Sequence, residues 1–410
     1  METRRRTRAW LLLLCVLLAC DGPAPAACRG SHWLGVWVSS PSDALGPPFV
    51  DQSLRLVVNP TLGGHRVRVR LSNRFGSQPV HFASAFIARR ASGAALVPRS
   101  SRRLRFSRRR SVAIPAGGEV VSDDVAFRFA AFQDLAVSVH VRGTSGVPSE
   151  HFLAFQTSYA SGSGSGDHAK DTSAAAFTRK LGNWPYLAAV EVKAAKTMGG
   201  VVAVGDSITD GVGAPPDSNR RYPDFLARRL ATAGRPLAAA VQNAGISGNQ
   251  VLTDGPPIYG RSLLTRLDAD VIALAGARVV ILMEGTNDLG ASPPATADAV
   301  IAGLQTIVAR LHTAGLRVLL GTQTPAKGAL TPHGAPAAIA ARNQINDWIR
   351  TGGDADGVVD FHLALRDPND PDRFRPEYDS GDHLHPSSAG YEAMADAVDL
   401  SLLGSSTCAP

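Results

Sequence analysis

Cysteine is scarce in this chain. Only four of the 410 residues are cysteine, and they lie at the two ends: Cys15, Cys20, Cys28 and Cys408. No CxxC pair or Cys/His cluster is present, which argues against a metal site built on thiolates. After loss of a leader, Cys28 and Cys408 would remain, and either a disulfide between the ends or two free thiols is compatible with their positions.

Long hydrophobic runs are also lacking. The apolar run at 9–19 follows four arginines and is too short for a stop-transfer helix. Small residues follow it, so residues 1–27 are predicted to be a secretory signal. The stretch 17–20 also reads as a lipobox ending at Cys20. We therefore expect a secreted or periplasmic protein, with a lipoprotein anchored to the membrane through Cys20 as the alternative.

A strong charge of one sign is absent as well. The net charge is +7, and loss of the predicted signal leaves about +5. The arginine-dense stretch 99–110 alternates with apolar residues as an exposed strand does, and no aromatic platform for bases accompanies it. We expect a solvated face there and no nucleic-acid partner.

The chain is long enough for two domains, and its apolar spacing changes near residue 196. Before that point the spacing is mostly two, as in His65–Leu71 and Leu135–Val141, with Gly and Pro turns between the runs. Repeated short alternating strands predict an antiparallel β-sandwich of the jelly-roll kind over residues 30–195.

From about 197 to 404 the pattern alternates between strand and helix. Strands are expected at 201–204, 238–241, 279–283, 318–320 and 358–361. Helices are expected at 222–232, 294–313, 339–349 and 387–400. This order is typical of a doubly wound α/β fold with a parallel five-stranded sheet.

Candidate catalytic residues follow the strands of this second half. Ser207 comes directly after the first strand, and Asp382 and His385 lie three residues apart before the last helix. A serine needs a base to become a nucleophile, and the base needs an orienting carboxylate. Chemistry in such sheets takes place at the carboxyl ends of the strands, so the sequence predicts a hydrolase with this triad. His383 and Asp379 are the competing base and orienter.

Four segments together resemble the signature blocks of the SGNH (GDSL-type) hydrolase family: Gly205–Gly211, Asn243–Asn249, Glu284–Asp288 and Asp382–His385. The resemblance covers about 201–400. It implies an oxyanion hole made of the backbone N–H groups of Ser207 and Gly248 and the side-chain amide of Asn287. It implies neither cofactor nor metal; Asp210 and Asp288 are read as solvated loop carboxylates or caps, and Asp206 as a helix cap.

The function expected from this reading is a secreted serine esterase that removes short acyl groups, acetyl above all, from a carbohydrate or similar polyol ester. A lipase or lysophospholipase is the first alternative, although the loops at 248–267 and 290–297 are short for an acyl channel. A non-catalytic glycan-binding protein is the second, and the intact triad argues against it. The expected partner is thus a small-molecule or glycan ester.

Overall fold

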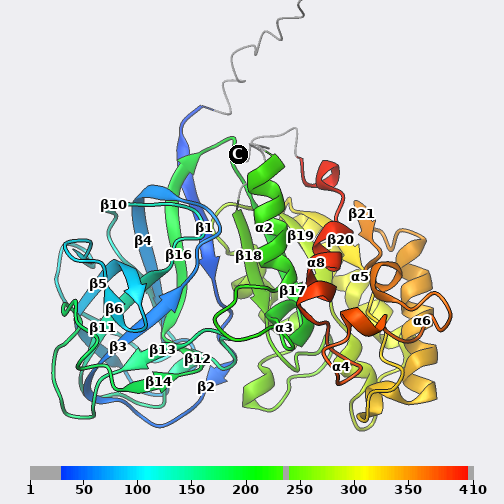
Figure 1. Ribbon diagram of the computed structural model, residues 1–410, viewed down its shortest axis with the longest axis horizontal. Helices are drawn as coiled ribbons and strands as arrows, with labels where there is room; N and C mark the ends of the chain where they lie inside the picture. The colour runs from blue at the N-terminus through cyan, green and yellow to red at the C-terminus, as the bar shows by residue number, and fades with distance from the viewer. Residues whose placement is uncertain (1–28, 234–239, 405–410) are drawn as a thin grey trace, which may run out of the picture.

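The computed structural model describes residues 29–233 and 240–404. Two bodies lie side by side in it: one built of strands, and one in which strands and helices alternate (Figure 1). The predicted signal at 1–27 and all four cysteines lie outside the described residues, so the signal and the alternatives for the cysteines stay predictions. In the part that is described, no helix is both long and apolar enough to span a membrane.

The N-terminal body consists of antiparallel sheets that curl over one another. One sheet has the order β1-β16-β4-β10, with β9 also paired to β4. Its strands are β1 (Ser31–Val38), β16 (Leu187–Ala195), β4 (Gly64–Ser72), β10 (Val125–Phe129) and β9 (Glu119–Val121). The architecture is therefore the predicted β-sandwich.

The facing sheet has the order β14-β13-β3-β11-β5-β6, with β7 and β8 also paired to β5. Its strands are β14 (Arg179–Leu181), β13 (Ser158–Ala160), β3 (Val50–Val58), β11 (Leu135–Thr144), β5 (Val80–Ser92), β6 (Ala95–Leu96), β7 (Arg102–Arg103) and β8 (Val112–Ile114). A small third sheet joins β15 (Trp184–Pro185), β12 (Ser149–His151) and β2 (Asp43–Ala44). His151, at the end of β12 in this third sheet, bonds to Asp210 of the second body.

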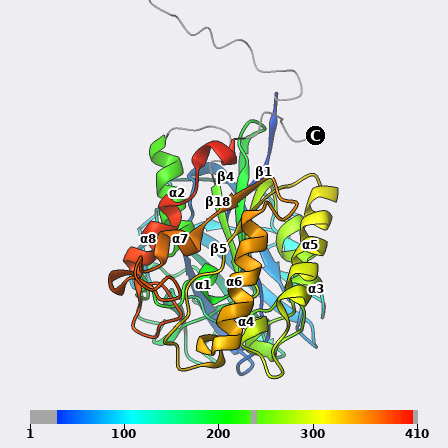
Figure 2. The same cartoon turned by 90° about the vertical axis from the view of Figure 1, so that its right-hand side faces the viewer.

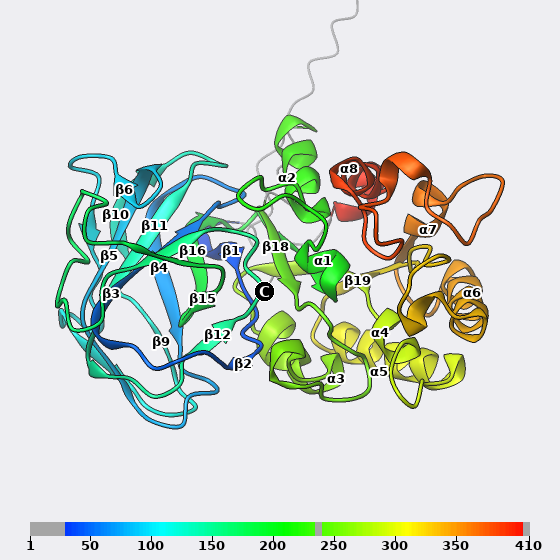
Figure 3. The same cartoon turned by 60° about the horizontal axis from the view of Figure 1, so that its bottom comes forward.

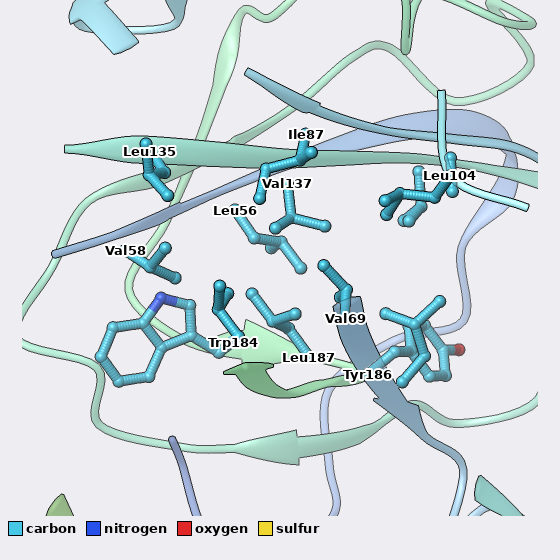
Figure 4. Close-up of a cluster of buried hydrophobic side chains, with 14 of the residues drawn as sticks. Leu56, Val58, Val69, Ile87, Leu104, Leu135, Val137, Trp184, Tyr186 and Leu187 are labelled. Atoms are coloured by element: carbon cyan, nitrogen blue, oxygen red, sulfur yellow. The ribbon is translucent and has the colours of Figure 1, made fainter. Parts of the chain in front are cut away.

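Apolar side chains from the two large sheets interdigitate in the sandwich core. Figure 4 shows Leu135 and Val137 of β11 on one side and Leu187 of β16 on the other. Strand β4 has the predicted alternation, with Val67, Val69 and Leu71 buried. Each such side chain contributes about 1.5–3 kcal/mol when fully buried.

Strand β11 differs from the prediction, because both of its faces are buried from Leu135 to Val141. The face expected to meet solvent carries Ser138, whose hydroxyl accepts a hydrogen bond from the buried guanidinium of Arg55 at 3.0 Å. Arg55 in turn donates to the carbonyls of Ala94 and Asp171. Loops thus cover this face, and periodicity alone does not reveal such a covering.

The arginine-dense stretch 99–110 has the predicted alternation. Leu104 and Phe106 are buried, whereas most of the arginines between and around them are exposed. The apolar side chains anchor the segment to the sandwich core. Its basic side chains form a solvated face.

The second body contains the predicted five-stranded parallel sheet, with the order β18-β17-β19-β20-β21. Its strands are β17 (Gly200–Gly205), β18 (Ala240–Gly245), β19 (Ala277–Met283), β20 (Arg317–Gly321) and β21 (Gly357–Val359). The chain order reverses beside β17, which places a topological switch point next to that strand. Residues 238 and 239 of the predicted second strand lie outside the described residues.

Helices cover both faces of this sheet (Figures 2 and 3). One face packs on α2 (Tyr222–Ala233), α7 (Phe361–Leu365) and α8 (Ser388–Asp396). The other packs on α3 (Leu263–Leu267), α5 (Ala297–Thr313) and α6 (Pro336–Arg350). The fold is therefore doubly wound as predicted.

Several element boundaries differ from the sequence prediction; β18, for example, runs to Gly245 instead of residue 241, and two of the differences are explained here. Phe361, expected to end the last strand, instead begins α7, because the Asp360 side chain caps that helix at the N–H of Leu363. The final helix, expected to run to residue 400, ends at Asp396 and is followed by a separate turn at Leu400–Leu403. Local capping chemistry decides both boundaries.

Strand β1 of the sandwich lies against β18 and joins the two bodies. The side-chain amide of Gln242 donates to the carbonyl of Gly35 at 2.9 Å, and the Gly35 N–H donates to the carbonyl of Ala275. Thr61 Oγ1 both accepts from and donates to the backbone of Val241 at 3.1 Å. These buried bonds fix the sandwich beside the edge strand of the parallel sheet.

Candidate active site

The turn after β17 holds Ser207 at the carboxyl edge of the sheet. All six residues of β17 are buried, and α1 (Ser207–Asp210) begins immediately after Asp206. The Asp206 carboxylate accepts a hydrogen bond from the Ile208 N–H at 2.9 Å and so caps α1, as predicted. At Gly205, an added Cβ would lie only 2.2 Å from the carbonyl oxygen of Met283, so this tight strand-to-helix turn requires glycine.

Ser207, His385 and Asp382 form one line of hydrogen bonds. The Ser207 Oγ lies 2.9 Å from His385 Nε2, and His385 Nδ1 lies 2.6 Å from Asp382 Oδ2. The other oxygen of Asp382 accepts the N–H groups of Leu384 and His385, each at 2.9 Å. Ser207 and His385, which are 178 positions apart in sequence, therefore meet as nucleophile and base, with Asp382 as the orienter of the base.

The Asp382 carboxylate is held in its ionised form. Burial acts to raise its pKa, but the hydrogen bonds from the His385 side chain and from the two backbone N–H groups outweigh burial and lower the pKa to about 2. The group therefore keeps its negative charge above about pH 3. A fixed carboxylate here holds the proton on His385 Nδ1 and leaves Nε2 to face the serine.

The competing pair, His383 and Asp379, lies elsewhere in the same loop. Their side chains bond to each other through Nδ1 and Oδ2, and Asp379 also accepts the N–H groups of Gly381 and His383. Neither residue lines the cavity that contains Ser207. His383 and Asp379 thus organise the loop but do not join the serine.

The three predicted oxyanion donors converge on the same cavity, of about 420 Å³. The N–H groups of Ser207 and Gly248 have no hydrogen-bond partner among the described residues. Gly248 has φ +79°, and a Cβ added to it would overlap the ring of Tyr259 at 2.1 Å. Only glycine fits both the backbone angle and the close approach.

Asn287, the third predicted donor, is the second residue of α4 (Thr286–Leu289). Its Nδ2 donates to the Asn249 carbonyl at 2.9 Å, and its Oδ1 lies 3.3 Å from His333 Nε2. Since an amide nitrogen carries two protons, one remains for the cavity. The amide is therefore fixed from both ends.

Tyr259 and His333 are among the cavity residues that were not identified from the sequence. Each comes from a short 3₁₀ turn in a connecting loop, Pro257–Tyr259 and Pro332–Gly334. Burial lowers the pKa of His333, and the neighbouring His385 adds to this effect, so the ring is favoured in its neutral form. No strand end or spacing marked these positions in the sequence.

Asp210 and Asp288 do not lie in solvent, and that part of the prediction was wrong. Asp288 is buried and accepts the N–H groups of Val251 and Leu252 at 2.8 and 3.0 Å. Asp210 is buried as well and receives hydrogen bonds from Ser247. The reason is that the buried loop after β18 has free N–H groups, which need acceptors.

Across the described chain, no group of three or more His, Cys, Asp or Glu side chains is arranged to hold a metal ion.

Asp206, which directly precedes Ser207, and Glu284 are two further buried carboxyl groups. Burial raises the pKa of Asp206 to about 7, and the charges of Asp288 and Asp210 add to the shift. Burial also raises the pKa of Glu284 well above its ordinary value, aided by Asp206. Neither oxygen of Glu284 has a hydrogen-bond partner in the described structure, and the charge of Arg266, whose Nη2 lies 4.0 Å from Oε2, opposes the rise in pKa without outweighing burial. A neutral Glu284 is the form this environment favours.

Replacing Glu284 by glutamine tests that inference through stability. Wild-type Glu284 binds its proton in the folded state and loses it in the unfolded state above about pH 4.5, so its contribution to stability falls as pH rises. Each unit of raised pKa costs about 1.4 kcal/mol above both values. We expect the melting temperature of Glu284→Gln, relative to wild type, to increase by several degrees between pH 5 and pH 8.

The matched control is Glu392→Gln, at an exposed position on α8. Its melting temperature should follow that of the wild type across the same pH range. A Glu284→Gln difference that is constant with pH would show that Glu284 does not change protonation on folding.

Comparison with known proteins gives one family match. Residues 203–393 match the model of the GDSL-like Lipase/Acylhydrolase family. A search of curated proteins gave no match.

Several solved structures are similar to about half of this chain. A GDSL-like lipase from Bacteroides thetaiotaomicron is 22% identical, over 50% of this chain and 88% of that chain, with a TM-score of 0.39. The aryl esterase of M. smegmatis is 18% identical, over 48% and 95%, with a TM-score of 0.40. A carbohydrate acetylesterase from Sinorhizobium meliloti is 16% identical, over 48% and 95%, with a TM-score of 0.38.

The family match begins within β17 and ends within α8, so it includes all four sequence blocks and the parallel sheet that positions them. Over residues 203–393 this chain is therefore similar to the GDSL-like Lipase/Acylhydrolase family.

Proposed function

We propose that the protein is a secreted serine esterase that hydrolyses carboxylic esters through an acyl-enzyme on Ser207. One observation carries the proposal: Ser207 Oγ, His385 and Asp382 are joined by hydrogen bonds of 2.9 and 2.6 Å beside two unpaired N–H groups. Export rests on the arginine-led apolar segment within residues 1–27.

In the first half of the reaction, Ser207 Oγ attacks the ester carbonyl while its proton passes to His385 Nε2. The carbonyl oxygen becomes an oxyanion, which the N–H groups of Ser207 and Gly248 and the Asn287 amide stabilise. The C–O bond to the alcohol then breaks, and His385 returns the proton to the leaving oxygen. Water repeats the sequence in the second half, which releases the acid and restores Ser207.

The lining of the cavity favours short acyl groups. Beside the catalytic residues it consists largely of small or polar side chains, among them Ser247, Gln250, Gly290, Ala291 and His333. Val212, Leu384 and Tyr259 supply the larger apolar side chains of the lining, in a cavity of about 420 Å³. A long acyl chain needs a continuous apolar channel, because each CH₂ gains about 0.8 kcal/mol only when it is buried. We therefore propose acetyl or similarly short groups, carried by a carbohydrate or another polyol.

A series of p-nitrophenyl esters from two to twelve acyl carbons tests this specificity. We expect kcat/KM to be highest at two to four carbons and to fall at least about 10-fold by eight carbons, since the added methylenes remain in water. A maximum at eight carbons or more would contradict the proposal and favour lipid hydrolysis.

A further inference from the structure

A chain of buried polar groups runs from the β-sandwich to the predicted oxyanion loop. It begins at His151, the last residue of β12, and continues through Asp210 of α1 to Ser247, which precedes Gly248. The exposed fractions of these residues are 3%, 2% and 7%. His151 belongs to the sandwich, whereas Asp210 and Ser247 belong to the second body.

The contacts of His151 indicate that its ring carries two protons. Nδ1 lies 2.8 Å from the Ser40 carbonyl. Nε2 lies 3.0 Å from both the Leu153 carbonyl and Asp210 Oδ1. Because every partner of both nitrogens is an acceptor, both nitrogens must donate. Burial by itself lowers the pKa of His151, but the charge and hydrogen bond of Asp210 and the two carbonyls outweigh it and raise the pKa.

The second oxygen of Asp210 holds the loop that contains Gly248. Asp210 Oδ2 accepts the Ser247 N–H at 3.0 Å and the Ser247 hydroxyl at 2.6 Å. Ser247 thus has both of its polar groups fixed by one carboxylate. The peptide that follows it carries the Gly248 N–H, so the orientation of that donor depends on how Ser247 is held.

We propose that His151 is a positioning residue of the esterase site, supplied by the sandwich domain. It neutralises and orients Asp210, and Asp210 holds Ser247 so that the Gly248 N–H faces the oxyanion. The inference rests on the proposed esterase function and assigns the sandwich a part in it. The two domains thereby share one active site.

Removing His151 would take away the only cation that is hydrogen-bonded to the Asp210 carboxylate among the described residues, because the nearby Arg221 is paired with Asp224. A buried carboxylate that loses its bonded countercharge moves or binds a proton. Ser247 would then lose a fixed acceptor. Oxyanion donors act through preorganisation, and complete loss of one costs about 10²–10³ in kcat. Displacing a donor without deleting it should cost less, on the order of 10–10².

The test compares His151→Leu, His151→Gln and a matched control, His140→Leu. His140 is also a buried sandwich histidine, with Nε2 3.1 Å from Asp51 Oδ1, but its recorded partners are all in the sandwich. Hydrolysis of p-nitrophenyl acetate is measured, and active sites are counted with a fluorophosphonate so that kcat refers to folded enzyme only.

We expect His151→Leu to lower kcat about 10- to 100-fold relative to His140→Leu, with KM changed less than about 3-fold, because the affected donor acts on the transition state. His151→Gln should recover part of the loss, since its amide can donate to Asp210. Adding Asp210→Asn to His151→Leu should cause little further loss, because both changes break the same chain.

A kcat for His151→Leu within about 3-fold of that for His140→Leu would overturn the proposal. If His151→Leu does not fold, the proposal is tested with Asp210→Asn and His151→Gln instead. An unchanged kcat in both variants would overturn the proposal. A lower kcat at constant KM in Asp210→Asn would support it. Failure of the esterase function itself is distinct, because it would appear as retained activity in Ser207→Ala.

Discussion

Ser207→Ala should lower kcat for p-nitrophenyl acetate by about 10⁶-fold, to the level left by binding and the oxyanion donors alone. The substitution removes only the Oγ atom that lies 2.9 Å from His385 Nε2. It leaves the Asp206 cap and the buried strand β17 intact, so the melting temperature should stay within a few degrees of the wild-type value. Steady-state kinetics and thermal unfolding on the same preparation measure both quantities.

The matched control is Ser163→Ala, on an exposed loop of the sandwich. It should retain wild-type turnover, and it should still react with a fluorophosphonate, whereas Ser207→Ala should not. Residual turnover in Ser207→Ala above about 1% of wild type would rule out Ser207 as the nucleophile.

Asp382→Asn should lower kcat by about 10⁴-fold with little change in KM. The native carboxylate accepts a hydrogen bond from His385 Nδ1–H at 2.6 Å, and its pKa of about 2 keeps it charged at every pH at which the assay is run. An asparagine in its place can present its NH₂ group to Nδ1, which favours the tautomer with the proton on Nε2. That tautomer cannot accept the serine proton. A complete pH–rate profile should show the loss at every pH above about 5.

Asp379→Asn serves as the comparison for Asp382→Asn, since Asp379 lies in the same loop and also bonds to a histidine Nδ1. Its partner His383 does not line the serine cavity. We expect a kcat loss below about 10-fold for Asp379→Asn. If Asp379→Asn proved the more damaging of the two, the assignment of the orienter would have to be exchanged.

The sequence carried enough information for the parallel sheet and for the juxtaposition of the triad. In a parallel sheet all carboxyl ends meet at one edge, so any polar residue just after a strand is brought to that edge. Ser207 was located by this rule, whereas Gly248 and Asn287 were implied as oxyanion donors by the resemblance of their blocks to the SGNH (GDSL-type) family. The same strands are recognisable because they are short, β-branched and buried on both faces.

The burial of Asp210 could not be predicted, because its partners come from outside its own block. Its acceptor role is created by Ser247 in the loop after β18, and its countercharge by His151 in the other domain. Nothing in the periodicity of the strands near residue 151 points to a residue 59 positions away. His333 was missed for a similar reason, since it reaches the cavity from a loop turn.

The contact between β12 and α1 also bears on how the chain could be divided. A protein that contained only the second body would lack the sandwich groups that form hydrogen bonds with Asp210, Gln242 and the edge of β18. Replacing the sandwich by a different N-terminal domain would leave the same hydrogen bonds unmade. In recombination, whether in evolution or in the laboratory, residues 31–403 must therefore be exchanged as one unit. The short segment between β16 and β17 is not a point at which the chain can be divided.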